Sequence, residues 1–366
     1  MDVVVWSGAV TGRATPRRGP QRQSFLRTKA AYTLNVREIA RLTEDQAFER
    51  FKLLRYAGSG GRPVCPKRHC HCDAVNTFRR WNKAHTTSRV IFKCKKCDHQ
   101  FTATSGTAFA YRKMSFQDIL YAIALFVQAQ KGTAALAIFG QLKCQYRVAL
   151  VLTHKLREAM SRAMDKDNGP FVGEVEADTS WIGGYERPQN LRQQADYKNT
   201  DRVKKNPYAF RDNGPTKRNV TAIIERGPNG RVFVDTTKAE IDSRDIIRSK
   251  VSAETVLLTD ATALYEQLAW DVKQHLQVNH SVCFWTGEAN TNTVESFFSG
   301  LKATITGVYH RITHPDYAVS YVKERGWRFE RRKKPTGDKF ADLINAIGLG
   351  GRSRFAGVWQ RRKQNG

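Results

Sequence analysis

The chain has 366 residues, with 61 Lys and Arg against 34 Asp and Glu, which gives a formal net charge of +27. This length is enough for two or three domains and a substantial core. Such an excess of positive charge predicts binding to a polyanion, although ribosomal and merely soluble basic proteins share it. No stretch reaches the ~18 apolar residues of a membrane span, and no secretory signal is recognisable, so we expect a cytoplasmic protein.

The positive charge is strongest at the two ends. Residues 1–30 hold six Arg and Lys and one acid, and residues 325–366 hold twelve Arg and Lys and three acids. Residues 1–32 lack hydrophobic periodicity and are predicted to be a flexible basic arm. Residues 333–366 have no clear pattern either and are predicted to be a basic tail.

Residues 33–110 combine a helix with a cysteine-rich segment. Residues 43–46, Thr-Glu-Asp-Gln, have the form of a capping box and precede an apolar helical face. Five of the seven cysteines follow within residues 65–97, which favours metal binding in a reducing compartment over disulfide bonds. Two cysteine pairs about twenty residues apart have the spacing of a structural zinc ribbon, in which four thiolates hold one Zn²⁺.

The zinc ligands are predicted from this spacing with one alternative. We expect the ligands to be Cys65, Cys70, Cys94 and Cys97. Cys72 is the alternative to Cys70, and His69 could also reach the metal. The segment contains few apolar residues, so we expect it to need the ion in order to fold.

Residues 111–166 are predicted to be a helical segment. Ser115 has the position of a cap before the apolar run of residues 119–126. Two further helices, over residues 132–140 and 145–160, are joined by a short glycine-containing turn and resemble a helix-turn-helix. The second of these helices carries the residues expected to face DNA, namely Arg147, His154, Lys155 and Arg157. A helical hairpin that packs on the next domain has the same pattern and remains the other interpretation.

Residues 167–332 show alternating strand and helix patterns, after a linker at residues 165–170. A β-prone segment over residues 171–184 has Asp178 near its middle. A short apolar run over residues 255–260 has the pattern of a buried strand and ends on Asp260.

A hairpin and a short helix are predicted between the two acidic strands. The hairpin strands cover residues 218–225 and 231–237, and the helix begins at Ser243. Residues 185–217 are polar and basic and are predicted to form a mobile loop near the acidic strands.

Residues 290–302 are predicted to form an amphipathic helix. Four apolar residues share one face of this helix, namely Val294, Phe297, Phe298 and Leu301. Glu295 and Lys302 are seven residues apart and project from nearly the same side, and Thr293 is a plausible cap. Two acids on adjacent strands and one on a following helix can bind two divalent ions, the arrangement used for phosphoryl transfer. Taken alone, the helix is better explained as an amphipathic surface helix with an ordinary charge pair.

These motifs resemble those of the DDE transposases, and more closely the bacterial insertion-sequence group called ISXO-two-like or IS-fifteen-ninety-five. The first motif of that group compares with residues 175–184 and the third with residues 292–302. A Gly-x-Tyr-His motif matches residues 307–310, and a further pattern matches Tyr321, Glu324 and Arg328. The resemblance covers roughly residues 40–332. The first motif departs from the usual form at Ala177, where a larger aliphatic is common, and at Thr179, which replaces an acid.

The resemblance implies an α/β fold, an RNase H-like catalytic domain preceded by a zinc ribbon and a helical segment. It implies that Asp178, Asp260 and Glu295 bind Mg²⁺ or Mn²⁺. Lys302 would contact a DNA phosphate near the scissile bond, and His310 would assist there. The enzyme would cut double-stranded DNA at the terminal repeats of an insertion sequence and join it to target DNA. It would act as a homo-oligomer on paired ends, associated with the bacterial nucleoid.

Two other functions fit the same residues. A non-catalytic DNA-binding protein derived from a transposase would use only the zinc ribbon and the helices. The complete set of acids argues against that protein, while Ala177 and Thr179 favour it. A nuclease of the same fold would cut DNA without joining it.

Overall fold

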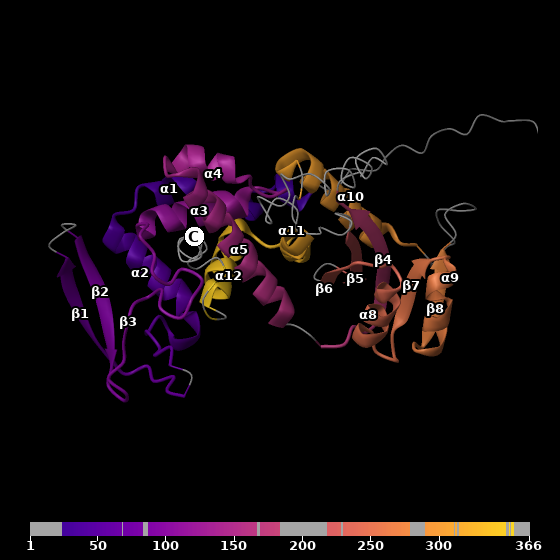
Figure 1. The fold of residues 1–366 in the computed structure, drawn as a ribbon, viewed down its shortest axis with the longest axis horizontal. Helices are drawn as coiled ribbons and strands as arrows, with labels where there is room; N and C mark the ends of the chain where they lie inside the picture. Colours follow the sequence, from indigo (N-terminus) through magenta and orange to yellow (C-terminus); the bar gives the residue numbers. More distant parts are fainter. Residues whose placement is uncertain are drawn as a thin grey trace, which may run out of the picture.

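The computed structural model describes residues 24–67, 69–82, 87–166, 169–183, 218–227, 230–278, 290–310, 312, 315–348, 351 and 353–354. Most of the expected basic arm, residues 1–23, and the expected basic loop of residues 185–217 lie outside these ranges. Figure 1 shows two β-sheets at opposite ends of the molecule, with helices between them. No helix in the described ranges is long and apolar enough to cross a membrane.

The N-terminal part begins with short helices and one longer helix. These are η1 (Phe25–Arg27), η2 (Lys29–Ala31), α1 (Val36–Ala40), α2 (Glu44–Arg55) and η3 (Ala57–Ser59). The predicted capping box at the start of α2 is confirmed. The backbone N–H of Gln46 donates to Thr43 Oγ1 at 3.3 Å, and the backbone N–H of Thr43 donates to Gln46 Oε1 at 2.9 Å.

The cysteine-rich segment forms a small antiparallel sheet. Its strands are β1 (Val75–Asn82), β2 (Thr87–Cys94) and β3 (Gln100–Phe101), in the order β1-β2-β3. Phe92 of β2 lies opposite Phe101 of β3, and both rings are buried. These rings join the small sheet to the helices, because Phe92 also stacks against Phe48 of α2.

Three helices follow, α3 (Phe116–Gln128), α4 (Ala135–Leu142) and α5 (Tyr146–Lys166). Ser115 caps α3 as predicted, because its Oγ accepts a hydrogen bond from the backbone N–H of Asp118 at 3.0 Å. The prediction of a glycine in the turn between α4 and α5 is wrong. Lys143 takes the left-handed conformation there, with φ of 46°, and the turn ends at residue 145.

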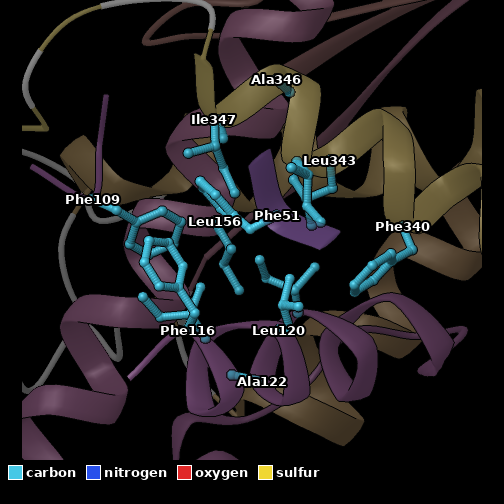
Figure 2. Packing of buried hydrophobic residues seen from close by; sticks show 14 of the residues in the cluster. Phe51, Phe109, Phe116, Leu120, Ala122, Leu156, Phe340, Leu343, Ala346 and Ile347 are labelled. Carbon is cyan, nitrogen blue, oxygen red and sulfur yellow. The ribbon is translucent and has the colours of Figure 1, made fainter. Parts of the chain in front are cut away.

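The C-terminal residues 336–348 form helix α12 (Thr336–Gly348), which the sequence analysis missed by predicting a patternless tail from residue 333. Figure 2 shows Phe340, Leu343 and Ile347 of this helix facing the side chains of α2, α3 and α5. One apolar core therefore joins the N-terminal helices to the end of the chain. The pattern is hard to recognise in the sequence because the short apolar face follows a run of four basic residues, residues 331–334.

The part of the chain from residue 170 to residue 330 contains a five-stranded sheet with the order β6-β5-β4-β7-β8. The strands are β4 (Glu174–Ile182), β5 (Arg218–Glu225), β6 (Val232–Thr237), β7 (Val256–Asp260) and β8 (Gln274–Val278). Strands β4, β5 and β6 are antiparallel neighbours, while β4 pairs with β7 and β7 with β8 in parallel. This mixed α/β sheet confirms the predicted fold class. Strand β8 was not predicted, because its residues Gln-His-Leu-Gln-Val lack a continuous apolar run.

Helices cover both faces of this sheet. The elements are α8 (Asp242–Lys250), α9 (Ala263–Glu266), η4 (Gln267–Trp270), α10 (Asn292–Thr304), the π-helix η5 (Ile305–Tyr309) and α11 (Pro315–Glu330). The apolar side chains of α10 and α11 pack on one face, together with those of β5 and β6. The opposite face packs against α8 and α9. Figure 1 shows α11 between this domain and the N-terminal helices.

Candidate active site and cysteine cluster

Asp178 and Asp260 lie at the same level on neighbouring parallel strands. Glu174 of β4 is opposite Val256 of β7, and Glu176 is opposite Leu258. The same register, continued by two residues, places Asp178 level with Asp260. The sheet pairing alone therefore brings together two acids that are far apart in the sequence.

Asp178 points towards α10. Val175 and Ala177 of β4 are buried in the core on the α8 face. Because successive side chains of a strand alternate between faces, Glu176 and Asp178 project to the opposite face. Glu176 confirms this direction, because its carboxylate accepts a hydrogen bond from the backbone N–H of Val294 in α10 at 2.9 Å.

Glu295 lies in the first turn of α10 and is exposed. The predicted cap at Thr293 is wrong, because the helix already begins at Asn292 with Thr291 as the N-cap residue. The hydroxyl of Thr291 donates to Glu295 Oε1 at 2.9 Å. The backbone N–H of Thr293 instead donates to Glu176 Oε2 at 2.8 Å, so a carboxylate of the sheet caps this helix.

The carboxylates of the three acids do not form a compact cluster. Among the described residues, the one group of three or more potential metal-ligand atoms that all lie within 4.8 Å of one another consists of cysteines. The carboxylate oxygens of the three acids are therefore not all within that distance of one another. Tyr265 is buried in the core on the α8 face of the sheet, and its hydroxyl donates to Thr179 Oγ1. Burial raises the pKa of this tyrosine well above its usual value, and the negative charges of Asp178, Glu240 and Asp260 raise it further.

Lys302 and His310 lie further along the same part of the chain. Lys302 is exposed in the last turn of α10, seven residues after Glu295. His310 follows the π-helix η5, is exposed and has a positive φ of 58°. It borders an open cavity of about 630 Å³ that Ala134 and Ile138 of the helical segment also line. The structure thus directs His310 towards the junction with α4.

Thr179 has two partners that the sequence analysis did not identify. Its Oγ1 donates to Glu240 Oε1 at 3.2 Å and accepts a hydrogen bond from the hydroxyl of Tyr265, also at 3.2 Å. Neither partner belongs to a recognisable motif, and both follow Thr179 by more than sixty residues. Thr179 stands where the resembling family has an acid, and Glu240 lies beside it. This proximity becomes apparent only in the folded structure.

Four cysteines form a compact cluster at the base of the β1–β3 sheet. The sulfur atoms of Cys65, Cys70, Cys94 and Cys97 all lie within 4.8 Å of one another. The distance from Cys65 Sγ to Cys97 Sγ is 3.7 Å, and that from Cys70 Sγ to Cys94 Sγ is 3.6 Å. Four sulfurs at the Zn–S distance of ~2.3 Å from a tetrahedral ion would be about 3.8 Å apart, so the cluster fits zinc.

The two alternative ligands lie outside this cluster. Cys72 is half-buried, and its Sγ donates to the backbone carbonyl of Ala74 at 3.8 Å. His69 also does not belong to the group of converging ligand atoms.

Two of the residues expected to face DNA from α5 are buried. His154 is 6% exposed and Arg157 is 1% exposed, so the prediction that they contact DNA is wrong for both. The guanidinium of Arg157 donates to Glu324 Oε2 at 2.8 Å and lies over the ring of Tyr321. Arg147 is exposed and Lys155 is half-buried. His154 and Arg157 instead face α11, where the ring of Tyr321 contacts both side chains.

Comparison with known proteins agrees with this arrangement. Residues 170–330 match the model of the ISXO2-like transposase domain, and residues 42–100 match the model of the transposase zinc-ribbon domain. The two matches together cover more than half of the chain, in the order expected from the resemblance. No curated protein matches the chain. The sheet topology, the cysteine cluster and both domain matches agree, and the chain belongs to the ISXO2-like transposase family.

Proposed function

We propose that this protein cuts DNA at the ends of an insertion sequence and joins the freed 3′ hydroxyl to target DNA by divalent-metal-dependent phosphoryl transfer. The observation that supports this proposal best is the parallel pairing of β4 with β7, whose register, continued by two residues, would bring Asp178 level with Asp260. The helix that carries Glu295 in its first turn packs on β4, the strand of Asp178, through the hydrogen bonds of Glu176. Asp178 and Asp260 are far apart in the sequence, and the pairing of β4 with β7 brings their strands together.

Asp178, Asp260 and Glu295 are the residues that would hold Mg²⁺ or Mn²⁺. Carboxylate oxygens are hard ligands, which suit these ions. A two-metal site holds its ions about 3.5–4 Å apart, and three carboxylates can share the coordination of both ions. When bound, the ions would activate the attacking oxygen and stabilise the leaving oxygen.

Lys302 and His310 would act on the DNA rather than on the metal ions. Lys302 is exposed, and its ammonium group can bind a phosphate oxygen near the scissile bond. His310 would assist from the end of η5, where its imidazole is exposed.

The N-terminal part would recognise the terminal repeats of the element. We propose that Cys65, Cys70, Cys94 and Cys97 bind the zinc ion that stabilises the β1–β3 sheet. On this sheet Arg80 lies opposite Arg89, and both are exposed. Two adjacent exposed arginines without a neighbouring acid in the strand pair suit contact with DNA phosphates.

The protein would assemble as a homo-oligomer on paired transposon ends and would act at the nucleoid in the bacterial cytoplasm. The net charge of +27 supports a partner that is a polyanion.

The proposal is tested by incubating the purified protein with Mg²⁺ and labelled DNA that carries the transposon ends. We expect cleavage at the ends and transfer to target DNA. Asp260→Asn or Glu295→Gln should abolish both reactions, because each change removes a negative charge and a metal ligand. DNA binding, measured by fluorescence anisotropy, should survive in both variants, because phosphate contacts elsewhere position the DNA.

Lys302→Ala serves as the graded comparison. It should slow cleavage less than the acid variants, because it removes a phosphate contact and leaves the metal ligands in place. A non-catalytic DNA-binding protein would show no cleavage in wild type, and a nuclease would cleave without strand transfer. Equal cleavage by wild type and Glu295→Gln would show that Glu295 is not a metal ligand.

A further inference from the structure

Glu176 lies on β4, two residues before Asp178, and has no part in the chemistry proposed above. Its side chain is only 1% exposed. A buried carboxylate is unfavourable unless hydrogen bonds and an opposite charge compensate it. Oε1 of Glu176 accepts from Nε of Arg226 at 2.8 Å. Oε2 accepts from the backbone N–H groups of Thr293 at 2.8 Å and Val294 at 2.9 Å.

The two backbone contacts are the cap of α10. The first N–H groups of a helix have no partner within the helix, and the side chain of the N-cap residue usually accepts from one of them. The N-cap residue Thr291 makes no such bond, and its hydroxyl contacts Glu295 instead. The sheet therefore supplies the cap through Glu176, whose negative charge is favourable at a helix N-terminus.

Arg226 extends this contact to the residue that enters the helix. Its Nη1 donates to Glu174 Oε2 at 2.9 Å, and its Nη2 donates to the backbone carbonyl of Asn290 at 2.6 Å. Burial lowers the pKa of Arg226, but hydrogen bonds to Glu176 and Glu174 raise it above its usual value. The cation is thus retained, and it connects the end of β5, the strand β4 and the start of α10.

We propose that Glu176 is a positioning residue of the catalytic site, an inference that rests on the proposed function. Strand pairing fixes Asp178 relative to Asp260, but it does not fix Glu295, which lies on a helix. Glu176 holds the N-terminus of that helix against β4. Glu295 lies within one turn of the capped N–H groups, and Asp178 lies two residues after Glu176 on the strand. Glu176 thereby sets the distance between Glu295 and Asp178.

The test is the affinity of the full-length, zinc-loaded protein for Mn²⁺, measured by isothermal titration calorimetry. In Glu176→Gln one oxygen is replaced by an NH₂ group, which would oppose either the guanidinium or the helix N–H groups. We expect Mn²⁺ to bind about 10- to 100-fold more weakly, the usual range when a residue that orients a ligand is changed. The Mg²⁺ concentration needed for half-maximal cleavage should rise in parallel, with DNA binding unchanged.

Glu225→Gln is the matched control. Glu225 also forms an ion pair with an arginine, at 2.6 Å to Arg231. It accepts hydrogen bonds from the backbone N–H groups of Arg231 and Val172, neither of which belongs to α10. Its loss should lower thermal stability without changing Mn²⁺ affinity. If Glu176→Gln does not fold, Arg226→Lys replaces it. This variant keeps the positive charge but loses the guanidinium hydrogen bonds to Asn290. Its Mn²⁺ affinity should therefore also fall, but by a smaller factor.

The outcomes separate this inference from the proposed function. Wild-type binding of Mn²⁺ that disappears in Asp178→Asn, together with unchanged affinity in a folded Glu176→Gln or Arg226→Lys protein, would overturn the positioning role alone. Wild type that shows no Mn²⁺ binding dependent on Asp178 would overturn both. An equal loss of affinity in Glu225→Gln would also overturn the inference, because it would reduce the effect to general destabilisation.

Discussion

Asp178 lies between the two positions at which this chain departs from the usual first motif of its family. Ala177 is fully buried in the core on the α8 face, and Thr179 is tied to Glu240 and Tyr265. Alternate residues of a strand point to opposite faces, so both departures lie on the face away from Asp178 and α10. The substitutions therefore alter packing and hydrogen bonding behind the sheet and leave the direction of the acid unchanged.

Cys70 and Cys72 are one residue apart, but only Cys70 lies in the cysteine cluster. We predict that Cys70→Ser abolishes stoichiometric zinc binding or lowers its affinity severely, because a thiolate ligand is lost from a four-sulfur site. Cys72→Ser should retain one zinc per chain. Mass spectrometry under native conditions, or zinc release measured with a chromogenic chelator, provides the measurement.

The reverse result, with zinc lost in Cys72→Ser and kept in Cys70→Ser, would assign the ligand to Cys72. Cys144→Ser is a control of the same chemistry, because Cys144 lies outside the cluster. It should bind zinc like the wild type.

At the scale of elements, a buried ion network connects α5 to α11 and η5. Glu324 of α11 accepts hydrogen bonds from Arg157 of α5 at 2.8 Å, from Arg328 at 2.8 Å and from the hydroxyl of Tyr309 at 2.8 Å. A side chain larger than hydrogen at Gly132, which has φ of +96°, would collide with the Tyr309 hydroxyl. Glu324 and Tyr309, which belong to motifs of the resembling family, thus contact Arg157, a residue that lies outside both matched ranges.

We predict that Glu324→Gln destabilises the protein by roughly 3–5 kcal/mol, the usual range when one partner of a buried ion pair is removed. Two arginines would then remain buried without their counter-charge. Chemical denaturation monitored by tryptophan fluorescence gives the free energy of unfolding. Burial raises the pKa of Glu324, but Arg157 and Arg328 lower it below its usual value of 4.5. In wild type this stabilisation is therefore present above pH 4.5 and is lost as the pH falls further.

Asp342→Asn is the control for this network. Asp342 pairs with Arg331 and Lys334 near the surface, with 31% of its side chain exposed. Exposed pairs contribute about 0–1 kcal/mol, so this variant should unfold nearly like the wild type. Similar losses in the two variants would mean that burial does not govern the strength of the Glu324 network.

Several elements could be predicted from the sequence because their signals are local. The capping box of α2, the hairpin of β5 and β6 and the strand that ends on Asp260 depend on nearby residues. Strand β8 and the capping group of α10 could not be predicted, because their partners are distant in the sequence. The cap of α10 comes from Glu176, more than one hundred residues earlier, and β8 obtains its pairing from β7.

At the scale of the whole molecule, the zinc-ribbon region is not an independent module. The core that contains Phe51 of α2 and Phe92 of β2 also contains Trp327 of α11 and Leu343 of α12. The α/β order and the metal-ligand cysteines were foreseeable from spacing, but this shared core was not, because no sequence pattern shows which apolar faces meet. DNA bound by the ribbon and DNA at the acids would therefore contact parts of one packed structure (Figure 1).

Removing α12 should consequently damage the N-terminal part, although α12 lies at the other end of the chain. A chain that ends at Lys334 loses five buried apolar residues of α12, namely Phe340, Leu343, Ile344, Ala346 and Ile347. Deleting even one buried leucine side chain typically costs about 2–5 kcal/mol, so we expect partial unfolding around α2, α3 and α5. Binding of a hydrophobic dye, a lower melting temperature and faster amide hydrogen exchange in α2 would report it. A chain that ends at Arg354 retains α12 and the hydrogen bond from the backbone N–H of Arg354 to Glu158, and it should melt like the wild type. If the chain ending at Lys334 also melted like the wild type, α12 would be the dispensable tail that its sequence suggests.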